Sequence, residues 1–358
     1  MAGWVSVWPP LAPGAWLRRP LEPPPFPLEE PGCRLYRLGR DAVWHGVRAL
    51  GLSTGDHVLV PAYHAGPEVE ALVWAGLQIS FYAGDQDLRP DESELERLIG
   101  PRTRMLSVVH YIGFPQQIAR WRRWCDQHGI LLLEDAAQAW LASDGEAPLG
   151  SSGDLALWSV YKTVGTPDGG VAICKAPLPA PRRSPRLPAP RLAKLHGAWL
   201  GRRLGALRLL RRDPSGEFDA VAHNKLGDPD APPAAGTAFL LPRLSGPEVP
   251  EQRRRNYRVL LESLSNLVPR PFGELTDGAC PWFFPVWTDD KPGLIAHLAD
   301  NGIGAMDFWS TPHPALDLSA FPDAAARRAS TVALPVHQEL KGDDLERIAR
   351  ATRAWLGP

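Results

Sequence analysis

A single lysine, Lys162, lies between two apolar runs of the sequence. The first run, Leu155–Trp158, is long enough for a buried strand, and the second, Val171–Cys174, follows Asp168-Gly169-Gly170. Burial disfavours the ammonium form, so a lysine in a tight turn between two such strands is expected to supply a neutral amine. A neutral lysine amine forms Schiff bases with aldehydes. The stretch 154–170 therefore predicts a lysine that carries an aldehyde cofactor, with a surface lysine in a hairpin loop as the alternative.

The same stretch contains a second chemical motif, because Ser159 and Lys162 spell S-x-x-K. In serine acyl enzymes this motif needs the serine at the start of a helix, together with S-D-N and K-T-G partners. Here the serine ends a strand-like run, Thr163 is followed by Val164, and S-D-N does not occur. An acyl-transfer enzyme with Ser159 as nucleophile is therefore the weaker interpretation.

A carboxylate lies at the end of another predicted strand. The apolar run Ile130–Leu133 ends in Glu134-Asp135-Ala136-Ala137-Gln138. Ligands of α/β folds bind at the carboxyl ends of parallel strands, and a buried aspartate there needs a partner. The protonated ring nitrogen of pyridoxal phosphate is such a partner. The alternative is an aspartate that caps a strand-to-helix turn.

The two segments together resemble the DegT/DnrJ/StrS family of pyridoxal-phosphate-dependent aminotransferases. The segments are LLLEDAAQAW (131–140) and LWSVYKTVGTPDGG (157–170). The resemblance extends through GDHVLVPAYH (55–64), SVVHYIGFPQQI (107–118), RRRNYRVL (253–260), PWFFPVWTDDKPGLIAHLADNGI (281–303) and LPVHQELKGDDLERIA (334–349).

The resemblance implies a role for each matching residue. Lys162 is expected to hold the cofactor and to move a proton during transfer, and Asp135 to keep the ring nitrogen protonated. Gln138 is expected to contact the ring 3-oxygen, and Ser159 the phosphate. The family implies an amino acid donor, glutamate by analogy, and a keto-sugar acceptor linked to a nucleotide, in polysaccharide or secondary-metabolite biosynthesis. It also implies a homodimer with active sites at the interface.

The segment Gly39-Arg40-Asp41 precedes a predicted helix that continues through Ala42–Leu50. A glycine that opens a helix makes a phosphate site, because the first N–H groups and the helix dipole point outward. The resemblance implies the cofactor phosphate here, although the family has a small hydroxyl residue where this chain has Arg40. Backbone contacts are therefore expected. The Arg40 guanidinium is expected to contact the phosphate, and the alternative is that it turns toward the substrate's phosphates or Asp41. An ordinary helix start is the alternative.

The residue expected to stack over the cofactor ring also differs. The aligned family position is aromatic, and here it is Ala65. Tyr63 or His64, which follow the predicted strand His57–Val60, are the candidate replacements. A core histidine is the alternative for His64.

Composition narrows the class of protein. The chain has 39 basic and 40 acidic residues, so no overall charge attracts it to nucleic acid or a membrane. Its four cysteines form no C-x-x-C pair, which favours reduced thiols and a cytoplasmic location over disulfides or a zinc site. No apolar stretch reaches membrane-spanning length, and no signal pattern opens the sequence.

The order of the predicted elements indicates an α/β fold with three parts. Residues 1–35 form a proline-rich arm, 36–245 a large cofactor-binding domain and 246–358 a small α+β domain. Strands and helices alternate in the large domain, as in a mainly parallel sheet covered on both faces. The arm is too rich in proline for a long helix or a central strand and is expected to drape over the body or a partner subunit.

A basic segment, 175–212, interrupts the large domain with eleven basic residues and no acidic residue. Residues 199–212 have the pattern of a basic amphipathic helix. Such a helix fits packing on the body as a solvated helix, the phosphates of a nucleotide-sugar, or an anionic membrane surface. The family's phosphate-binding asparagine has only Asn224 as a weak counterpart. His313 and His337 lie in predicted loops and receive no role.

A non-catalytic relative that serves as a scaffold or regulator also fits the sequence. The altered positions Arg40 and Ala65 favour that alternative, whereas the retention of Lys162 and Asp135 favours the enzyme.

Overall fold

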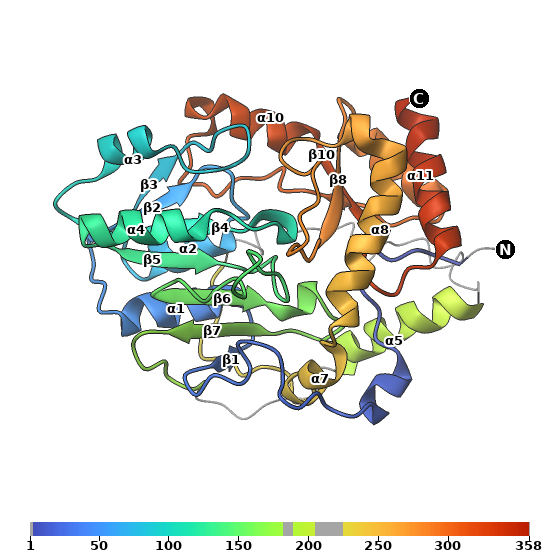
Figure 1. Cartoon of the computed structure of the whole chain (residues 1–358), viewed down its shortest axis with the longest axis horizontal. Helices are drawn as coiled ribbons and strands as arrows, with labels where there is room; N and C mark the ends of the chain where they lie inside the picture. Colours follow the sequence, from blue (N-terminus) through green and yellow to red (C-terminus); the bar gives the residue numbers. More distant parts are fainter. Residues whose placement is uncertain (1–2, 182–188, 205–224, 358) are drawn as a thin grey trace.

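The computed structural model describes residues 3–181, 189–204 and 225–357. Its centre is a seven-stranded sheet in the order β1-β7-β6-β5-β4-β2-β3 (Figure 1). The strands are β1 (Arg34–Tyr36), β2 (His57–Pro61), β3 (Gln78–Tyr82), β4 (Thr103–Val109), β5 (Leu131–Asp135), β6 (Leu155–Ser159) and β7 (Gly170–Cys174). Strands β3, β2, β4, β5 and β6 are parallel, and β7 and β1 join one edge in antiparallel pairs. The prediction of a mainly parallel α/β sheet is confirmed.

Helices cover both faces of this sheet because alternate residues of each strand are buried on opposite sides. Helices α1 (Gly39–Ala49) and α2 (Pro67–Trp74) share one apolar cluster with Val58, Met105 and Leu133. Helices α3 (Glu92–Leu98) and α4 (Ile118–His128) share another with the adjacent residues Leu59, Leu106 and Leu132. The change of face from one residue to the next explains why these strands are apolar throughout.

The second sheet has three antiparallel strands in the order β8-β10-β9. They are β8 (Phe283–Trp287), β9 (Met306–Asp307) and β10 (Thr331–Pro335). The helices of this half are α8 (Glu248–Leu264), α9 (Lys291–Asp300), α10 (Pro322–Ser330) and α11 (Gly342–Leu356). The sequence patterns predict helices at Pro250–Leu264, Leu294–Asn301 and Asp343–Trp355 and strands at Trp282–Trp287 and Ala305–Trp309, which correspond to α8, α9, α11, β8 and β9. They predict no element at α10 or β10. Figure 1 shows α8 crossing between the two sheets.

The proline-rich N-terminal segment lies against the body, one of the two placements expected for it, and contains one short 3₁₀ helix, η1 (Pro13–Leu17). Val5 pairs with Ile303 in a parallel bridge, and the carbonyl of Gly3 accepts a hydrogen bond from Arg347 Nη2 at 2.7 Å. The first residues of the arm therefore pack on the second half of the chain.

The basic segment is described only in part. Helix α5 spans Ala189–Leu204, so the helix begins earlier than the predicted 199–212, and residues 205–212 lie outside the described residues. Helix α7 (Thr237–Leu244) follows the second gap. In the described ranges, no helix has the length and apolar character needed to cross a bilayer.

Candidate functional site

Lys162 and Asp135 come from neighbouring parallel strands. Asp135 is the last residue of β5, where it pairs with Leu157 of β6. Strand β6 ends at Ser159 and passes directly into a three-residue 3₁₀ turn, η3 (Val160–Lys162). Because the carboxyl ends of parallel strands meet at one edge of a sheet, the fold brings the predicted lysine and the predicted carboxylate to the same edge.

The amine of Lys162 lies against an aromatic ring from the second half of the chain. Its Nζ is 4.5 Å from the ring centroid of Trp282, the residue that precedes β8. This geometry is that of a cation–π contact. An S-x-x-K acyl enzyme needs the lysine amine beside the serine hydroxyl, and no hydrogen bond joins Lys162 to Ser159 in the described part of the chain. The contact with Trp282 therefore argues against the acyl-transfer interpretation.

Asp135 is a buried carboxylate with only 4% of its surface exposed. One oxygen, Oδ1, accepts the N–H of Ala137 at 2.8 Å, and within the described residues the other has no hydrogen-bond partner. Burial raises the pKa of Asp135 to about 6 and the nearby Glu68 adds to the rise, whereas the Ala137 N–H and the charge of Lys162 oppose it. A carboxylate in this position gains most from a cationic partner, which would restore its charged form.

Gly39 and Ser159 meet at the start of helix α1. A Cβ atom on Gly39 would lie 2.8 Å from Ser159 Oγ, so only glycine lets the helix start come this close to the serine hydroxyl. The first N–H groups of a helix lack acceptors within the helix. The fold therefore brings these N–H groups and the Ser159 hydroxyl, all hydrogen-bond donors, close together, an arrangement that suits an anion.

The two residues after Gly39 have local partners of their own. Arg40 Nη1 donates to the carbonyl of Lys225 at 2.6 Å, and burial lowers the pKa of Arg40. Asp41 Oδ2 accepts the N–H of Leu38 at 3.0 Å, which caps the helix. The other Asp41 oxygen is buried and unpartnered among the described residues, and burial raises the pKa of Asp41 to about 7.

Gln138 lies beside the same edge, at 4% exposure. Its Oε1 accepts the N–H of Ile112 at 2.8 Å. This bond orients the amide, because it assigns the oxygen and leaves Nε2 as a donor without a partner in the described portion. An oriented donor of this kind suits the role expected of Gln138 at a phenolic oxygen.

His64 and Tyr63, the two candidates for stacking on the cofactor ring, pack against other aromatic rings. His64 is fully buried and stacks on Phe81 with 5.3 Å between ring centroids, and burial lowers its pKa to about 3. Tyr63 packs against Tyr111 and Trp309 at 5.8 and 5.1 Å. The structure places His64 as a core histidine, and it gives neither ring a contact with Lys162.

The sequence did not predict the aromatic side chains of Trp8, Tyr161 and Trp282 beside Lys162, which together form an aromatic wall. Trp8 of the arm contacts Tyr161 and Trp282, with ring centroids 6.1 and 5.6 Å apart. The arm also runs so close to the loop after Lys162 that a Cβ on Gly165 would lie 2.8 Å from the carbonyl oxygen of Pro10. The only signal for Trp282 was its place in the segment 281–303, and nothing in the sequence pointed to Trp8.

The residues without an assigned role lie outside this site. His313 Nε2 is 2.7 Å from Glu70 Oε2, and His337 Nε2 is 3.0 Å from the carbonyl oxygen of Ser6. Asn224 lies outside the described residues.

These features fit pyridoxal phosphate. The unpartnered oxygen of buried Asp135 suits a cationic ring nitrogen, and the helix start at Gly39 beside the Ser159 hydroxyl offers donors that suit a phosphate. Lys162 lies at the edge of the same sheet, where the cofactor aldehyde needs an amine. Gln138 supplies a fixed donor.

Comparison with known proteins agrees with the fold and the site. Residues 38–181 match the model of the DegT/DnrJ/EryC1/StrS aminotransferase family. The dTDP-3-amino-3,4,6-trideoxy-alpha-D-glucose transaminase of Streptomyces venezuelae is 27% identical over 335 residues, which cover 88% of this chain and 81% of the relative. The GDP-perosamine synthase of Vibrio cholerae is 29% identical over 138 residues, 38% of each chain.

The solved structures agree in fold. A putative sugar aminotransferase from Streptococcus pneumoniae, in its PMP form, has a TM-score of 0.70 at 18% identity and covers 98% of both chains. The DesV protein of S. venezuelae has a TM-score of 0.67 at 24% identity and covers 91% of this chain and 85% of that chain. The chain therefore resembles the DegT/DnrJ/EryC1/StrS aminotransferases, whose family model matches residues 38–181, and it has the type I fold of pyridoxal-phosphate-dependent aminotransferases.

Proposed function

We propose that this protein transfers an amino group from an amino acid to a nucleotide-linked keto-sugar, with pyridoxal phosphate as cofactor. The observation that carries the proposal is the position of Lys162 and Asp135 on adjacent parallel strands. The names of relatives that aminate dTDP-, GDP- and UDP-linked sugars support a nucleotide-linked acceptor. Glutamate is the donor we infer from the family resemblance.

Each residue has a defined task in this proposal. When bound, pyridoxal phosphate supplies an aldehyde for an amine and a ring that draws electron density from the substrate. Lys162 would hold that aldehyde through its amine. Once released, the amine would act as general base for the proton on the donor Cα and pass it to the cofactor, and it would run the same transfer in reverse for the acceptor. Asp135 accepts a hydrogen bond from the ring nitrogen and holds its proton in place.

The remaining contacts fix the cofactor. The N–H groups at the start of α1 and the hydroxyl of Ser159 hold the phosphate, and Gln138 Nε2 donates to the 3-oxygen. The amine of Lys162 faces Trp282, so the indole covers one side of the place where the proton moves.

The experiment that tests this function uses Lys162→Ala. Wild-type protein mixed with pyridoxal phosphate should develop a visible absorbance band, and it should aminate a member of a panel of dTDP-, UDP- and GDP-linked keto-sugars when glutamate is supplied. Lys162→Ala should lose the covalent band and turnover together. A variant that retained full turnover would exclude Lys162 as the reacting amine.

A non-catalytic relative is the second candidate. One relative, 24% identical over 343 residues, is named as the erythromycin biosynthesis sensory transduction protein EryC1 of Saccharopolyspora erythraea. A wild-type chain that binds the cofactor but aminates no sugar of the panel would favour this candidate.

We also infer a homodimer in the cytoplasm. The resemblance supports the dimer, and so does apolar exposure, because Leu17 of η1 is 88% exposed and Phe239 of α7 is 43% exposed. Light scattering of the purified chain tests the dimer, and fractionation of cells tests the location.

A further inference from the structure

Arg253 is a buried arginine on α8 with no carboxylate among its partners in the described part of the chain. Its exposed fraction is 1%, and burial lowers its pKa to about 10. A buried charge without a counter-charge opposes folding unless hydrogen bonds compensate for its lost hydration. The placement of these hydrogen bonds therefore indicates what the residue contributes.

Every hydrogen bond from Arg253 goes to an oxygen that carries no full charge. Nη2 donates to the carbonyl of Thr163 at 2.6 Å, and Nη1 to those of Pro281 and Trp282 at 2.8 and 3.3 Å. Nε donates to Gln338 Oε1 at 2.9 Å, and Gln338 Nε2 in turn donates to the carbonyl of Thr163 at 3.3 Å. The planar guanidinium thus links three separate segments in one fixed arrangement.

Two of these carbonyls belong to the neighbourhood of the reacting amine. Thr163 follows Lys162 directly, and Trp282 supplies the ring whose centroid is 4.5 Å from Lys162 Nζ. One side chain therefore fixes both the backbone that carries the lysine and the backbone that carries its aromatic partner.

We propose that Arg253 is a positioning residue for Lys162. By binding the carbonyls of Thr163 and Trp282, Arg253 keeps the Lys162 amine in contact with the Trp282 indole. The inference rests on the proposed function in that Lys162 is the reacting amine. An arginine suits this task better than a lysine, because an ammonium is a compact charge without the flat, forked set of donors.

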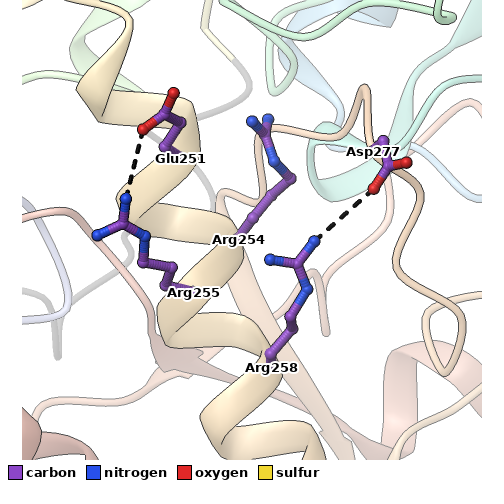
Figure 2. Close-up of a pocket in the computed structure, with 5 residues that line it drawn as sticks. All are labelled: Glu251, Arg254, Arg255, Arg258 and Asp277. Carbon is purple, nitrogen blue, oxygen red and sulfur yellow. Dashed lines mark hydrogen bonds and ion pairs between the residues drawn. The ribbon is translucent and has the colours of Figure 1, made fainter.

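The outer face of the same helix provides a matched control. Arg254, Arg255 and Arg258 line a surface pocket of about 280 Å³ together with Glu251 and Asp277 (Figure 2). Arg255 pairs with Glu251 at 3.4 Å, and its side chain is 66% exposed. Figure 2 shows this pair on the outside of the helix, so Arg255→Lys changes the same residue type on the same helix without touching Lys162.

The main experiment compares Arg253→Lys with Arg255→Lys, both loaded with pyridoxal phosphate and both verified as folded by far-UV circular dichroism. We expect Arg253→Lys to lower kcat roughly 10- to 100-fold, because a displaced reacting group loses its alignment. We expect KM for the amino donor to change by less than about threefold, since binding of the donor is not what is removed. The visible circular dichroism of the bound cofactor should change in Arg253→Lys and match wild type in Arg255→Lys.

A second variant covers the case in which Arg253→Lys fails to fold. Gln338→Met keeps Arg253 but removes the acceptor of Nε and one donor to Thr163. In the apoprotein, we expect Lys162 to react about threefold or more faster with trinitrobenzenesulfonate in Gln338→Met than in wild type, because the amine loses its fixed place on Trp282. Mass spectrometry of the labelled peptide identifies the lysine.

The outcomes separate the two proposals. If the wild-type chain develops no visible band with pyridoxal phosphate, the proposed function fails, and the labelling rate of Lys162 alone decides the role of Arg253. Wild-type kcat and circular dichroism in every folded variant, together with an unchanged labelling rate, would overturn the inference and leave Arg253 as a residue of fold stability only.

Discussion

His110 and Glu134 form a fully buried pair in which Nε2 lies 3.0 Å from Oε1. The N–H of Gln116 donates to His110 Nδ1, so the ring proton is on Nε2 and points at Glu134. Glu134 Oε2 also accepts the N–H groups of Ser152 and Gly153, each at 2.9 Å. Glu134 thus holds the loop before β6 in place, and the neighbouring Asp135 is left for chemistry.

Asp135→Asn and Glu134→Gln should therefore fail in different ways. Asp135→Asn keeps the shape but removes the charge that holds the ring proton, so kcat should fall roughly a hundredfold or more while the unfolding temperature changes little. Glu134→Gln should mainly lower the unfolding temperature, because Gln cannot accept as many hydrogen bonds. Parallel kinetics and thermal unfolding check both. A low kcat in Glu134→Gln at wild-type unfolding temperature, together with a nearly unchanged kcat in Asp135→Asn, would assign the ring nitrogen to Glu134 instead of Asp135.

Gly39→Ala tests the close approach of the helix start to Ser159. The added Cβ would lie 2.8 Å from Ser159 Oγ, so the hydroxyl or the helix start must move. We expect the cofactor to bind about tenfold or more weakly, since the displaced donors no longer converge on the phosphate. The control is Gly100→Ala, where a Cβ meets nothing within 4 Å. Equal affinity of both variants in a cofactor titration would contradict a phosphate at this place.

Arg40→Ala tests the residue in which this chain departs from its family. A guanidinium in direct contact with the phosphate should contribute about 1.5–3 kcal/mol to cofactor binding. Because Arg40 already donates to the carbonyl of Lys225, we expect the measured loss of binding free energy to be below about 1.5 kcal/mol. The measurement is a cofactor titration of the apoprotein. A larger loss would place the guanidinium on the phosphate, and a raised KM for the sugar nucleotide would place it on the substrate.

Asp41→Asn should change how the apoprotein responds to pH. Burial raises the pKa of Asp41 from 3.8 to about 7, so between these values the folded chain holds a proton that the unfolded chain releases. The contribution of Asp41 to stability is therefore present below pH 3.8 and is lost as the pH rises toward 7. Asn at this position does not titrate and retains an oxygen to accept the Leu38 N–H.

The unfolding free energy of Asp41→Asn minus that of wild type should therefore be roughly 2 kcal/mol larger at about pH 8 than at about pH 5. Urea unfolding at the two pH values measures it. Asp277→Asn, which alters a fully exposed carboxylate, is the control and should change little. A constant difference between Asp41→Asn and wild type across that range would mean that Asp41 is already ionised in the folded chain.

The residues nearest in sequence to the chemistry were predictable from local patterns. The buried strand that ends at Asp135 and the turn between two strands that carries Lys162 both follow from short apolar runs with polar ends. The helix that begins at Gly39 was also predicted from the local sequence. Each of these patterns lies within a few residues of the side chain that it positions.

The rest depends on long-range packing that local patterns do not encode. Tyr63 and His64 follow a strand apolar on both faces, so alternation could not decide which ring is turned inward. Helix α10 has few large apolar residues, because its packing relies on Ala324 and on the buried stem of Arg328. The burial of Arg253 could have been predicted, since Arg253 lies four residues from both Val249 and Tyr257 on the buried face of α8.

The arm that carries Trp8 has a consequence for the order in which the molecule is completed during synthesis. The arm leaves the ribosome well before its partners do. Val5 pairs with Ile303, the carbonyl oxygen of Ser6 lies 3.0 Å from His337 Nε2, and the carbonyl of Gly3 accepts a hydrogen bond from Arg347. These contacts form only after Ile303, His337 and Arg347 have been made. The central sheet can form before the second half of the chain has been made, but the aromatic wall beside Lys162 is complete only when Trp282 is present to meet Trp8.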